Sequence, residues 1–478
     1  MLCTSRDHLI EECRLHLAFA SERAQFFFNT GTSKLALDEI YDYLRCSGGS
    51  CKVVYGSSGA GKTSVISKAV EMVRSWCLEM DLVVVASFGG ISNDSASISA
   101  GLDSLNKQLQ IISRGKDAFV FGADNSESDG LGQVPLDFDG RREFFTYALE
   151  DWKCQWGHLV LFIDSVDQLD NSNVGRQLGW LPVEFSENVH LVVSMLPDGV
   201  DSLDGRPFRG LSILQGRCQQ SAFTEVKVLG DPRELLQFLL RSKLRRITAK
   251  QMQSLIQALD KTSMARTPLM MTLLADLASS WRSGHVAIAA ESIPSSVQGI
   301  IQNVFHCLYR ALWLEDSTII HKRFVESTLR ILSLVRRGVL ETELLEILSL
   351  QDDVVADITH IWSWTPQVCI PWAPLFLILN KLAPYLSRRE ESVGVVRFWY
   401  HRQFLKTARM AYLHDPHICA ESHTVLFDFF SGEWSEHNKT CSKYLAQRVG
   451  KTACLRFVRS QPLVLNGKSP LFPALKSM

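Results

Sequence analysis

The chain has 478 residues, of which 46% are hydrophobic and 21% charged, so it is long enough for several folded domains and leaves little room for long disordered segments. Its 50 Lys and Arg side chains face 51 Asp and Glu, which gives no overall attraction to nucleic acid or to an anionic membrane. The 12 cysteines form no CxxC pair, and no apolar run approaches the ~20 residues of a spanning helix. We therefore expect a cytoplasmic chain with reduced thiols and no membrane span.

Helical and strand patterns alternate in the first half of the chain. Apolar residues recur at helical spacing over 7–27 and 35–44, and a short apolar strand at 52–55 leads through a loop into a helix over 64–80. Further strands are predicted at 82–86, 159–163 and 191–193, with helices over 96–112 and 142–154 and a polar loop at 124–132. Strands that are apolar at every position are typical of a parallel sheet buried on both faces. The sequence therefore predicts an α/β domain with a parallel sheet between layers of helices.

From about residue 230 the pattern becomes helical nearly throughout. Apolar residues at helical spacing predict helices over 232–246, 248–260, 268–282, 294–314, 320–335, 341–349, 373–386 and 400–412. No repeat with a period of 20 to 50 residues is visible. An α-rich region is thus expected to follow the α/β domain.

A phosphate-binding motif stands between the strand at 52–55 and the helix that follows it. The motif GxxxxGK[ST] is matched by Gly56, Ser57, Ser58, Gly59, Ala60, Gly61, Lys62 and Thr63, with Ser64 next in the chain. Its glycines let backbone N–H groups surround phosphate oxygens, Lys62 can reach the β- and γ-phosphates, and the Thr63 hydroxyl can bind Mg²⁺. The alternative is a glycine-rich turn that only begins a helix. The order of strand, loop and helix favours a site for ATP or ADP with Mg²⁺.

Two aspartates follow the apolar strand at 159–163. Asp164 comes directly after it, where a carboxylate can hold the hydration shell of a metal bound to the loop. Asp167 is three residues further on and is the candidate catalytic residue, because it could orient or deprotonate a water for attack on the γ-phosphate. An acid in such a place can equally be an ordinary turn or cap residue. Because the chain also contains the phosphate-binding loop, we predict Thr63 and Asp164 as the metal ligands.

The amino-acid sequence around these aspartates resembles that of NACHT domains. The segment Phe162 to Asp170, followed by Trp180-Leu181-Pro182 and by Val189 to Ser194, is similar to NACHT-and-WD-repeat proteins and their nephrocystin and telomerase-associated relatives. The similarity continues through Arg337 to Leu340, through Trp399 to Phe404, and to Ser431-Gly432-Glu433-Trp434, which in such proteins precedes C-terminal repeats. The chain thus resembles P-loop NTPases of the STAND class, without the C-terminal repeats of these relatives.

The resemblance implies a nucleotide clamped between the α/β domain and regulatory helices, with ADP holding a closed form and ATP an open, assembling one. It divides the chain into a helical segment (1–50), a NACHT nucleotide domain (51–222), a helical domain (223–300), a winged-helix domain (301–412) and a C-terminal helical segment (413–478). By the same analogy Pro268 lies against the base or sugar and His401 approaches the β-phosphate. Both have simpler explanations, since Pro suits the first turn of a helix and a His among aromatic residues is often a core residue.

The sequence also departs from the family pattern. Gln168 stands where many NACHT domains carry Glu, Met195 where many carry Arg, and the segment 28–31 lacks the usual Gly-Arg. An amide cannot act as a base and a thioether carries no charge. We therefore expect nucleotide binding with slow or negligible hydrolysis, which makes the chain at most a weak ATP hydrolase.

Three functions remain open from the sequence. The first is a nucleotide-dependent switch that regulates assembly or signalling through protein partners or self-association, with no indication of nucleic acid. The second is a slow ATPase that remodels a partner complex, and the third, by analogy alone, is a scaffold subunit of a ciliary or ribonucleoprotein assembly. A zinc site is a weaker idea, because its four candidate ligands fall within one short segment: His414, His417, Cys419 and His423.

Overall fold

A computed structural model describes residues 5–92, 95, 97–114, 131–169, 177–199, 208–227, 230–260, 266–282, 293–294, 296–311, 322–335, 338–359, 370–391 and 394–431. The chain divides into two compact units, residues 1–300 and 301–478. Residues 124–130 of the loop predicted at 124–132, and the segment from residue 432 onward, lie outside the described residues. No described helix is both long enough and apolar enough to cross a bilayer.

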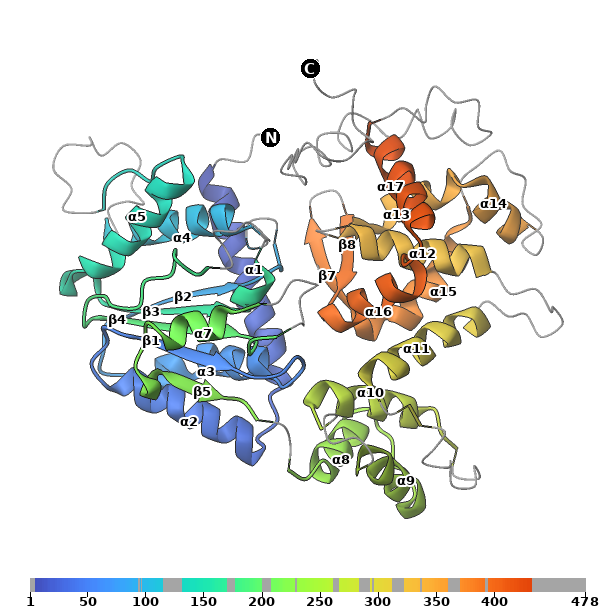
Figure 1. Ribbon diagram of the computed structural model, residues 1–478, viewed down its shortest axis with the longest axis horizontal. Helices are drawn as coiled ribbons and strands as arrows, with labels where there is room; N and C mark the ends of the chain where they lie inside the picture. Colours follow the sequence, from blue (N-terminus) through green and yellow to red (C-terminus); the bar gives the residue numbers. More distant parts are fainter. Residues whose placement is uncertain are drawn as a thin grey trace. The chain divides into compact units, whose positions relative to one another are not determined.

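A parallel five-stranded sheet forms the centre of the first unit (Figure 1). Its strands lie in the order β2-β3-β4-β1-β5, and neighbouring strands pair in parallel. Their bounds are β1 Cys51–Tyr55, β2 Leu82–Phe88, β3 His158–Asp164, β4 Val189–Met195 and β5 Phe223–Glu225. β3 and β4 are apolar and buried along nearly their whole length because helices cover both faces of the sheet.

The two faces of the sheet pack on different helices (Figure 1). Side chains alternate between the faces, so Val53, Leu161 and Leu191 pack on one side while Val54, Val160 and Val192 pack on the other. The first side is covered by α4 Ile98–Ser113, α5 Phe138–Glu150 and α7 Gly210–Gln215, and the second by α1 Ser5–Gln25, α2 Gly31–Arg45 and α3 Lys62–Trp76. The prediction of a parallel sheet between helix layers is confirmed.

Three helices complete the described part of the first unit before α11 begins. They are α8 Arg233–Ser242, α9 Ala249–Asp260 and α10 Pro268–Ser279, and α10 packs against α8. α10 buries a nearly continuous apolar surface that includes Leu269, Met271 and Leu274. The Phe238 ring of α8 contacts the Phe28 ring, at 4.9 Å between centroids, so α8 also touches the segment that precedes α2.

The second unit is rich in helices and contains a small antiparallel sheet. Its helices are α11 Val297–Ala311, which begins in the first unit, α12 Lys322–Leu334, α13 Glu341–Ser349, α14 Asp352–Thr359, α15 Trp372–Leu382, α16 Arg402–Tyr412 and α17 Pro416–Ser431. The sheet has the order β6-β8-β7, formed by β6 Val339–Leu340, β7 Leu386–Glu391 and β8 Gly394–Trp399. Phe404 stacks on Trp399 at 5.7 Å and on Tyr385 at 4.9 Å, and these rings lie in the core of the unit.

Several segments differ from the predicted secondary structure, including α7 and α14, where no helix was predicted. The helix expected over 373–386 ends at Leu382, because the chain turns through a short 3₁₀ helix into β7. The hairpin of β7 and β8 lies where no strand was predicted. The helix expected to reach residue 246 ends at Ser242, since Leu244 adopts a left-handed backbone conformation with φ of 55°. β5, which belongs to the parallel sheet, begins at Phe223, one residue after the predicted end of the nucleotide domain at residue 222.

Candidate functional site

The phosphate-binding loop connects the carboxyl end of β1, which lies between β4 and β5, to α3. Gly59 and Gly61 have φ of +80° and +98°, a conformation that residues with a Cβ rarely adopt. α3 begins at Lys62 without a side-chain cap, so no capping side chain accepts hydrogen bonds from the first backbone N–H groups of the helix. The Lys62 ammonium folds back and donates to the carbonyl oxygens of Gly56, at 2.8 Å, and Ser57, at 3.0 Å.

Asp164 lies beside the start of α3. The Thr63 hydroxyl donates to its Oδ2 atom at 2.8 Å, and the Ser165 hydroxyl donates to the same oxygen at 3.1 Å. The Ser194 hydroxyl donates to Oδ1, and Ser194 also accepts the Ser165 amide at 2.9 Å. Because β3 lies next to β4, and β4 lies next to β1, the ends of these parallel strands bring the three segments to one edge of the sheet.

Asp164 is 3% exposed, and three hydroxyl groups donate hydrogen bonds to its carboxylate. Burial raises the pKa of this carboxyl above its ordinary value, while hydrogen bonds from Ser194 and Thr63 oppose the rise. Ser165, next in the chain, has φ of 61° and is therefore strained. A buried acid held by three hydroxyl groups favours binding of a cation, which would compensate the cost of burying the charge.

Asp167 lies in the short 3₁₀ helix Val166–Gln168 that follows β3. Its Oδ1 atom accepts the Leu196 amide at 3.1 Å, so the carboxylate is fixed against the end of β4. Gln168 is exposed, and its side-chain oxygen approaches Gly90. Met195 is completely buried, so its side chain belongs to the core of the sheet. The catalytic role of Asp167 stays a prediction.

The N-terminus of α10 lies against the phosphate-binding loop. Thr267 caps this helix, with the Met270 amide donating to its hydroxyl at 3.3 Å, and Pro268 occupies the first turn. The Leu269 amide donates to the Gly59 carbonyl at 3.3 Å. A Cβ on Gly61 would lie 3.5 Å from Pro268. The structure thus brings Pro268 to the loop, while its contact with a base or sugar stays a prediction.

These residues fit a nucleotide with Mg²⁺. Thr63 and Asp164 supply a hydroxyl and a carboxylate 2.8 Å apart, which are oxygen ligands that Mg²⁺ accepts. The uncapped start of α3 and the left-handed glycines form a cradle for an anion, and Lys62 adds a positive charge. When bound, the magnesium nucleotide would supply the phosphate oxygens and the cation. The protein residues would then bind, orient and neutralise these groups.

His401 belongs to the second unit, where it caps α16. Its Nδ1 atom accepts the Gln403 amide at 3.2 Å, and its ring lies 5.9 Å from the Tyr400 ring. This local role accounts for the residue without a ligand, and its approach to a phosphate stays a prediction. The residues considered for zinc lie at and within α17, and among the residues that the structure describes no three His, Cys, Asp or Glu side chains gather as metal ligands.

A buried polar group in α1 was not found from the sequence. Glu12 and His16 are 5% and 3% exposed, and their side chains form a hydrogen bond of 3.0 Å. His16 Nδ1 accepts the Phe88 amide at 3.0 Å, so the proton lies on Nε2 and is donated to Glu12. The Ser92 hydroxyl also donates to Glu12. The next amide after Phe88, that of Gly89, donates to the Asp164 carbonyl at 3.0 Å, which connects α1 to the candidate site.

Comparison with known proteins agrees with this geometry. No protein-family model matches the chain. It is 26% identical over 465 residues to the human NACHT domain- and WD repeat-containing protein 1, and 23% identical over 446 residues to the human NACHT and WD repeat domain-containing protein 2. These alignments cover 95% and 90% of the chain. The chain resembles NACHT and WD-repeat proteins.

This similarity confirms the resemblance found from the sequence motifs. The mouse NACHT domain- and WD repeat-containing protein 1 is 27% identical over 95% of the chain. The chain spans 27% of the length of the human and mouse protein 1 and 23% of human protein 2. Together with the loop, the strand-end aspartate and the parallel sheet, the similarity supports a nucleotide-binding P-loop NTPase.

The chain has a distant likeness to several solved structures. The Aeropyrum pernix ORC1 protein in complex with DNA is 13% identical, with a TM-score of 0.33 over 81% of this chain and 93% of that chain. A variant of Thermotoga maritima RuvB is 13% identical, with a TM-score of 0.26 over 76% of this chain and 89% of that chain. At these TM-scores the likeness has no bearing on what the chain binds.

Proposed function

We propose that the chain is an ATP- and ADP-binding switch of the STAND type, which regulates the assembly of protein partners through nucleotide-dependent rearrangement of its domains. The observation that supports the proposal is that one loop contacts both the parallel sheet and the helices that follow it. Thr63 of the loop bonds to Asp164 at the edge of the sheet, and Gly59 of the same loop bonds to Leu269 of α10. Nucleotide bound in the loop would therefore be sensed by the helices after the sheet.

The second unit supports this proposal by its architecture. We infer that residues 301–412 form a winged helix, because a three-stranded antiparallel sheet packs with α12, α13 and α16. By family resemblance the regulatory domain contacts the nucleotide through His401. The resemblance also motivates the assembly role, since the relatives carry WD repeats in their names.

Nucleotide content tests the binding half of the proposal. The chain is purified without added nucleotide and denatured, and the released small molecules are identified by mass spectrometry. We expect close to one ADP or ATP per chain for the wild type and little for Lys62→Ala. Lys68→Ala is the matched control, because Lys68 lies on the same helix and pairs at the surface with Glu71 at 2.6 Å. Equal nucleotide in wild type and Lys62→Ala would refute the proposal.

Solution scattering tests the switching half. Exchange of ADP for ATP in the presence of Mg²⁺ should change the radius of gyration of the wild type and leave Lys62→Ala unchanged. An unchanged wild type would leave nucleotide binding intact and reject the switch.

Hydrolysis distinguishes the slow ATPase. Asp167 follows Asp164 by three residues and its carboxylate accepts the Leu196 amide, so it is our candidate for a group that orients water. Steady-state turnover that Asp167→Asn abolishes would favour the ATPase, whereas nucleotide binding without turnover above background favours the switch.

A further inference from the structure

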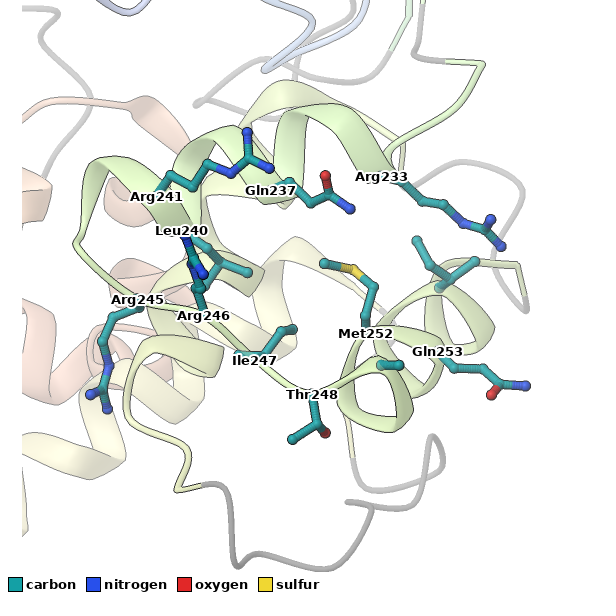
Figure 2. A pocket seen from close by; sticks show the side chains of 12 residues that line it. Arg233, Gln237, Leu240, Arg241, Arg245, Arg246, Ile247, Thr248, Met252 and Gln253 are labelled. Atoms are coloured by element: carbon teal, nitrogen blue, oxygen red, sulfur yellow. The ribbon is translucent and has the colours of Figure 1, made fainter.

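A groove of about 770 Å³ lies between α8 and α9, and this volume is within the roughly 300–1,000 Å³ of typical small-molecule sites. Its floor is apolar, and Figure 2 shows Leu240, Ile247 and Met252 facing the space between the helices. Arg233 lies at one end, and Arg241 and Arg246 lie at the other. The groove thus combines an apolar floor with positive charge at both ends.

Two carboxylates of this region pair with other cations, while the Asp231 carboxylate accepts the Arg233 backbone amide at 2.9 Å, and Glu234 follows Arg233 in the first turn of α8. Asp276 pairs with Lys243 at 2.5 Å, and Asp260 pairs with Arg266 at 2.6 Å. In the part of the chain that the structure describes, no carboxylate forms an ion pair with Arg233, Arg241 or Arg246. Uncompensated guanidinium groups gathered at one groove attract an anion.

A strained turn fixes one end of the groove. α8 ends in a Schellman motif, in which the Arg245 amide donates to the Leu240 carbonyl and the Leu244 amide to the Arg241 carbonyl, both at 2.9 Å. Leu244 holds the left-handed position usually taken by Gly, and it is 94% exposed. Arg245 turns away and donates to the Ser279 carbonyl at 2.7 Å, which anchors the turn and leaves Arg246 beside the floor (Figure 2).

Helix geometry sets the spacing of the charges. Arg233, Gln237 and Arg241 stand at i, i+4 and i+8, so they share one face of α8. Eight residues of helix separate the two arginine Cα atoms by about 12 Å. All the cationic side chains that line the groove are arginines, whose planar forks bind phosphate oxygens in pairs. The helix backbones that enclose the groove offer no strand edge with which an extended acidic peptide could pair.

We propose that this groove binds a ligand that carries several phosphate groups, separately from the P-loop. The phosphates lie at Arg233 and at the pair Arg241 and Arg246, and the carbon skeleton of the ligand covers the apolar floor. Gln237, between the two ends, provides an amide for hydroxyl groups of the ligand. A free polyphosphorylated molecule and the headgroup of a phosphorylated lipid share this chemistry.

Titration of the full chain with inositol hexakisphosphate tests the site, with Mg²⁺ and ADP at saturation so that the P-loop is blocked. Loss of two guanidinium groups in Arg241→Gln with Arg246→Gln should weaken binding at least about tenfold. The matched control is Arg74→Gln with Arg114→Gln, which removes two exposed arginines from α3 and from the end of α4, and it should change affinity less than about twofold. Lys62→Ala should keep wild-type affinity, which separates this site from nucleotide binding.

Further arms identify the source of the phosphate. Binding to phosphatidylcholine vesicles that contain phosphatidylinositol bisphosphate, but not to vesicles with phosphatidylserine, indicates a lipid headgroup. Binding of inositol hexakisphosphate alone indicates a free ligand. The proposal is overturned if neither phosphate source binds, if both arginine pairs weaken binding equally, or if polyglutamate of similar charge binds as tightly. Retained ADP in the variant confirms that it is folded.

Discussion

Replacing His16 by alanine tests whether α1 is fixed to the sheet by its buried polar group. The change leaves the Glu12 carboxylate buried without its ring donor and removes the acceptor of the Phe88 amide. Leaving a buried carboxylate without one of its hydrogen-bond donors costs about 1–3 kcal/mol. We expect the free energy of opening at this contact to fall by that amount.

Hydrogen exchange measures the effect at the contact itself, because the Phe88 amide donates to the removed ring. A loss of about 1–3 kcal/mol corresponds to roughly 5–150-fold faster exchange of peptides that contain Phe88. Arg14→Ala is the control on the same helix. Arg14 is exposed and only loosely paired with Glu11 at 3.8 Å, so exchange at Phe88 should hardly change.

A double-mutant cycle with Glu12→Ala decides whether the pair interacts. If His16 and Glu12 stabilise each other, the double variant should lose less than the sum of the two single variants, by about 1–3 kcal/mol. Effects that add within about 0.5 kcal/mol would refute the reasoning.

The pH dependence of stability gives a second check on Glu12. Burial acts to raise the pKa of this carboxyl, but the hydrogen bonds from His16 and from the Ser92 hydroxyl hold the pKa below its usual 4.5. A carboxyl whose pKa is lowered by folding stabilises the protein fully at pH values above its pKa in the unfolded state. This stabilisation is lost as the pH falls through its pKa in the folded state. The His16→Ala variant should therefore lose less stability than the wild type between neutral pH and pH below 4.5.

Three other substitutions test the remaining contacts. Gly59→Ala should lower the free energy of unfolding by about 2–5 kcal/mol, measured by thermal unfolding without nucleotide. The backbone at Gly59 is left-handed, and the new Cβ would lie 2.7 Å from the Leu269 Cβ. An unchanged free energy of unfolding would contradict this packing. ADP with Mg²⁺ at about 100 times its Kd should raise the Tm of the wild type by roughly 5–10 °C, and Asp164→Asn should abolish the part that depends on Mg²⁺. Leu244→Gly should raise the free energy of unfolding by about 0.5–1 kcal/mol in urea, since glycine relieves the left-handed strain, and a loss of stability would show that the exposed leucine makes a stabilising contact.

The parts of the fold that follow local rules could be predicted from the sequence. The phosphate-binding motif fixes the order of strand, loop and helix, and the apolar run before Asp164 requires a strand buried on both faces. Parallel strands end at one edge of the sheet, so Thr63 and Asp164 were expected to meet there, and the structure brings them within 2.8 Å.

The remainder depends on contacts between distant segments, which leave little local signal. Ser194 is a polar residue near the end of the mostly apolar β4, and this was the one indication in the sequence that its hydroxyl reaches Asp164. Glu12 and His16 lie one helical turn apart and read as an ordinary surface pair until the helix is placed on β2. The turn at Leu244 could not be predicted either, because leucine gives no indication of a left-handed conformation.

The contact between α10 and the loop sets a limit on the proposed switch. Burial of Leu269 contributes about 1.5–3 kcal/mol, and its hydrogen bond to Gly59 adds about 0.5–1.5 kcal/mol. Even if nucleotide exchange broke both of these contacts completely, the free-energy difference between the two states would change by about 2–4.5 kcal/mol. This is less than the roughly 5.5 kcal/mol needed to reverse a 1:99 population. A complete switch therefore requires further contacts that depend on the nucleotide. His401 is the predicted source of such a contact, so His401→Ala should reduce the change in compactness on exchange of ADP for ATP while leaving bound ADP in place.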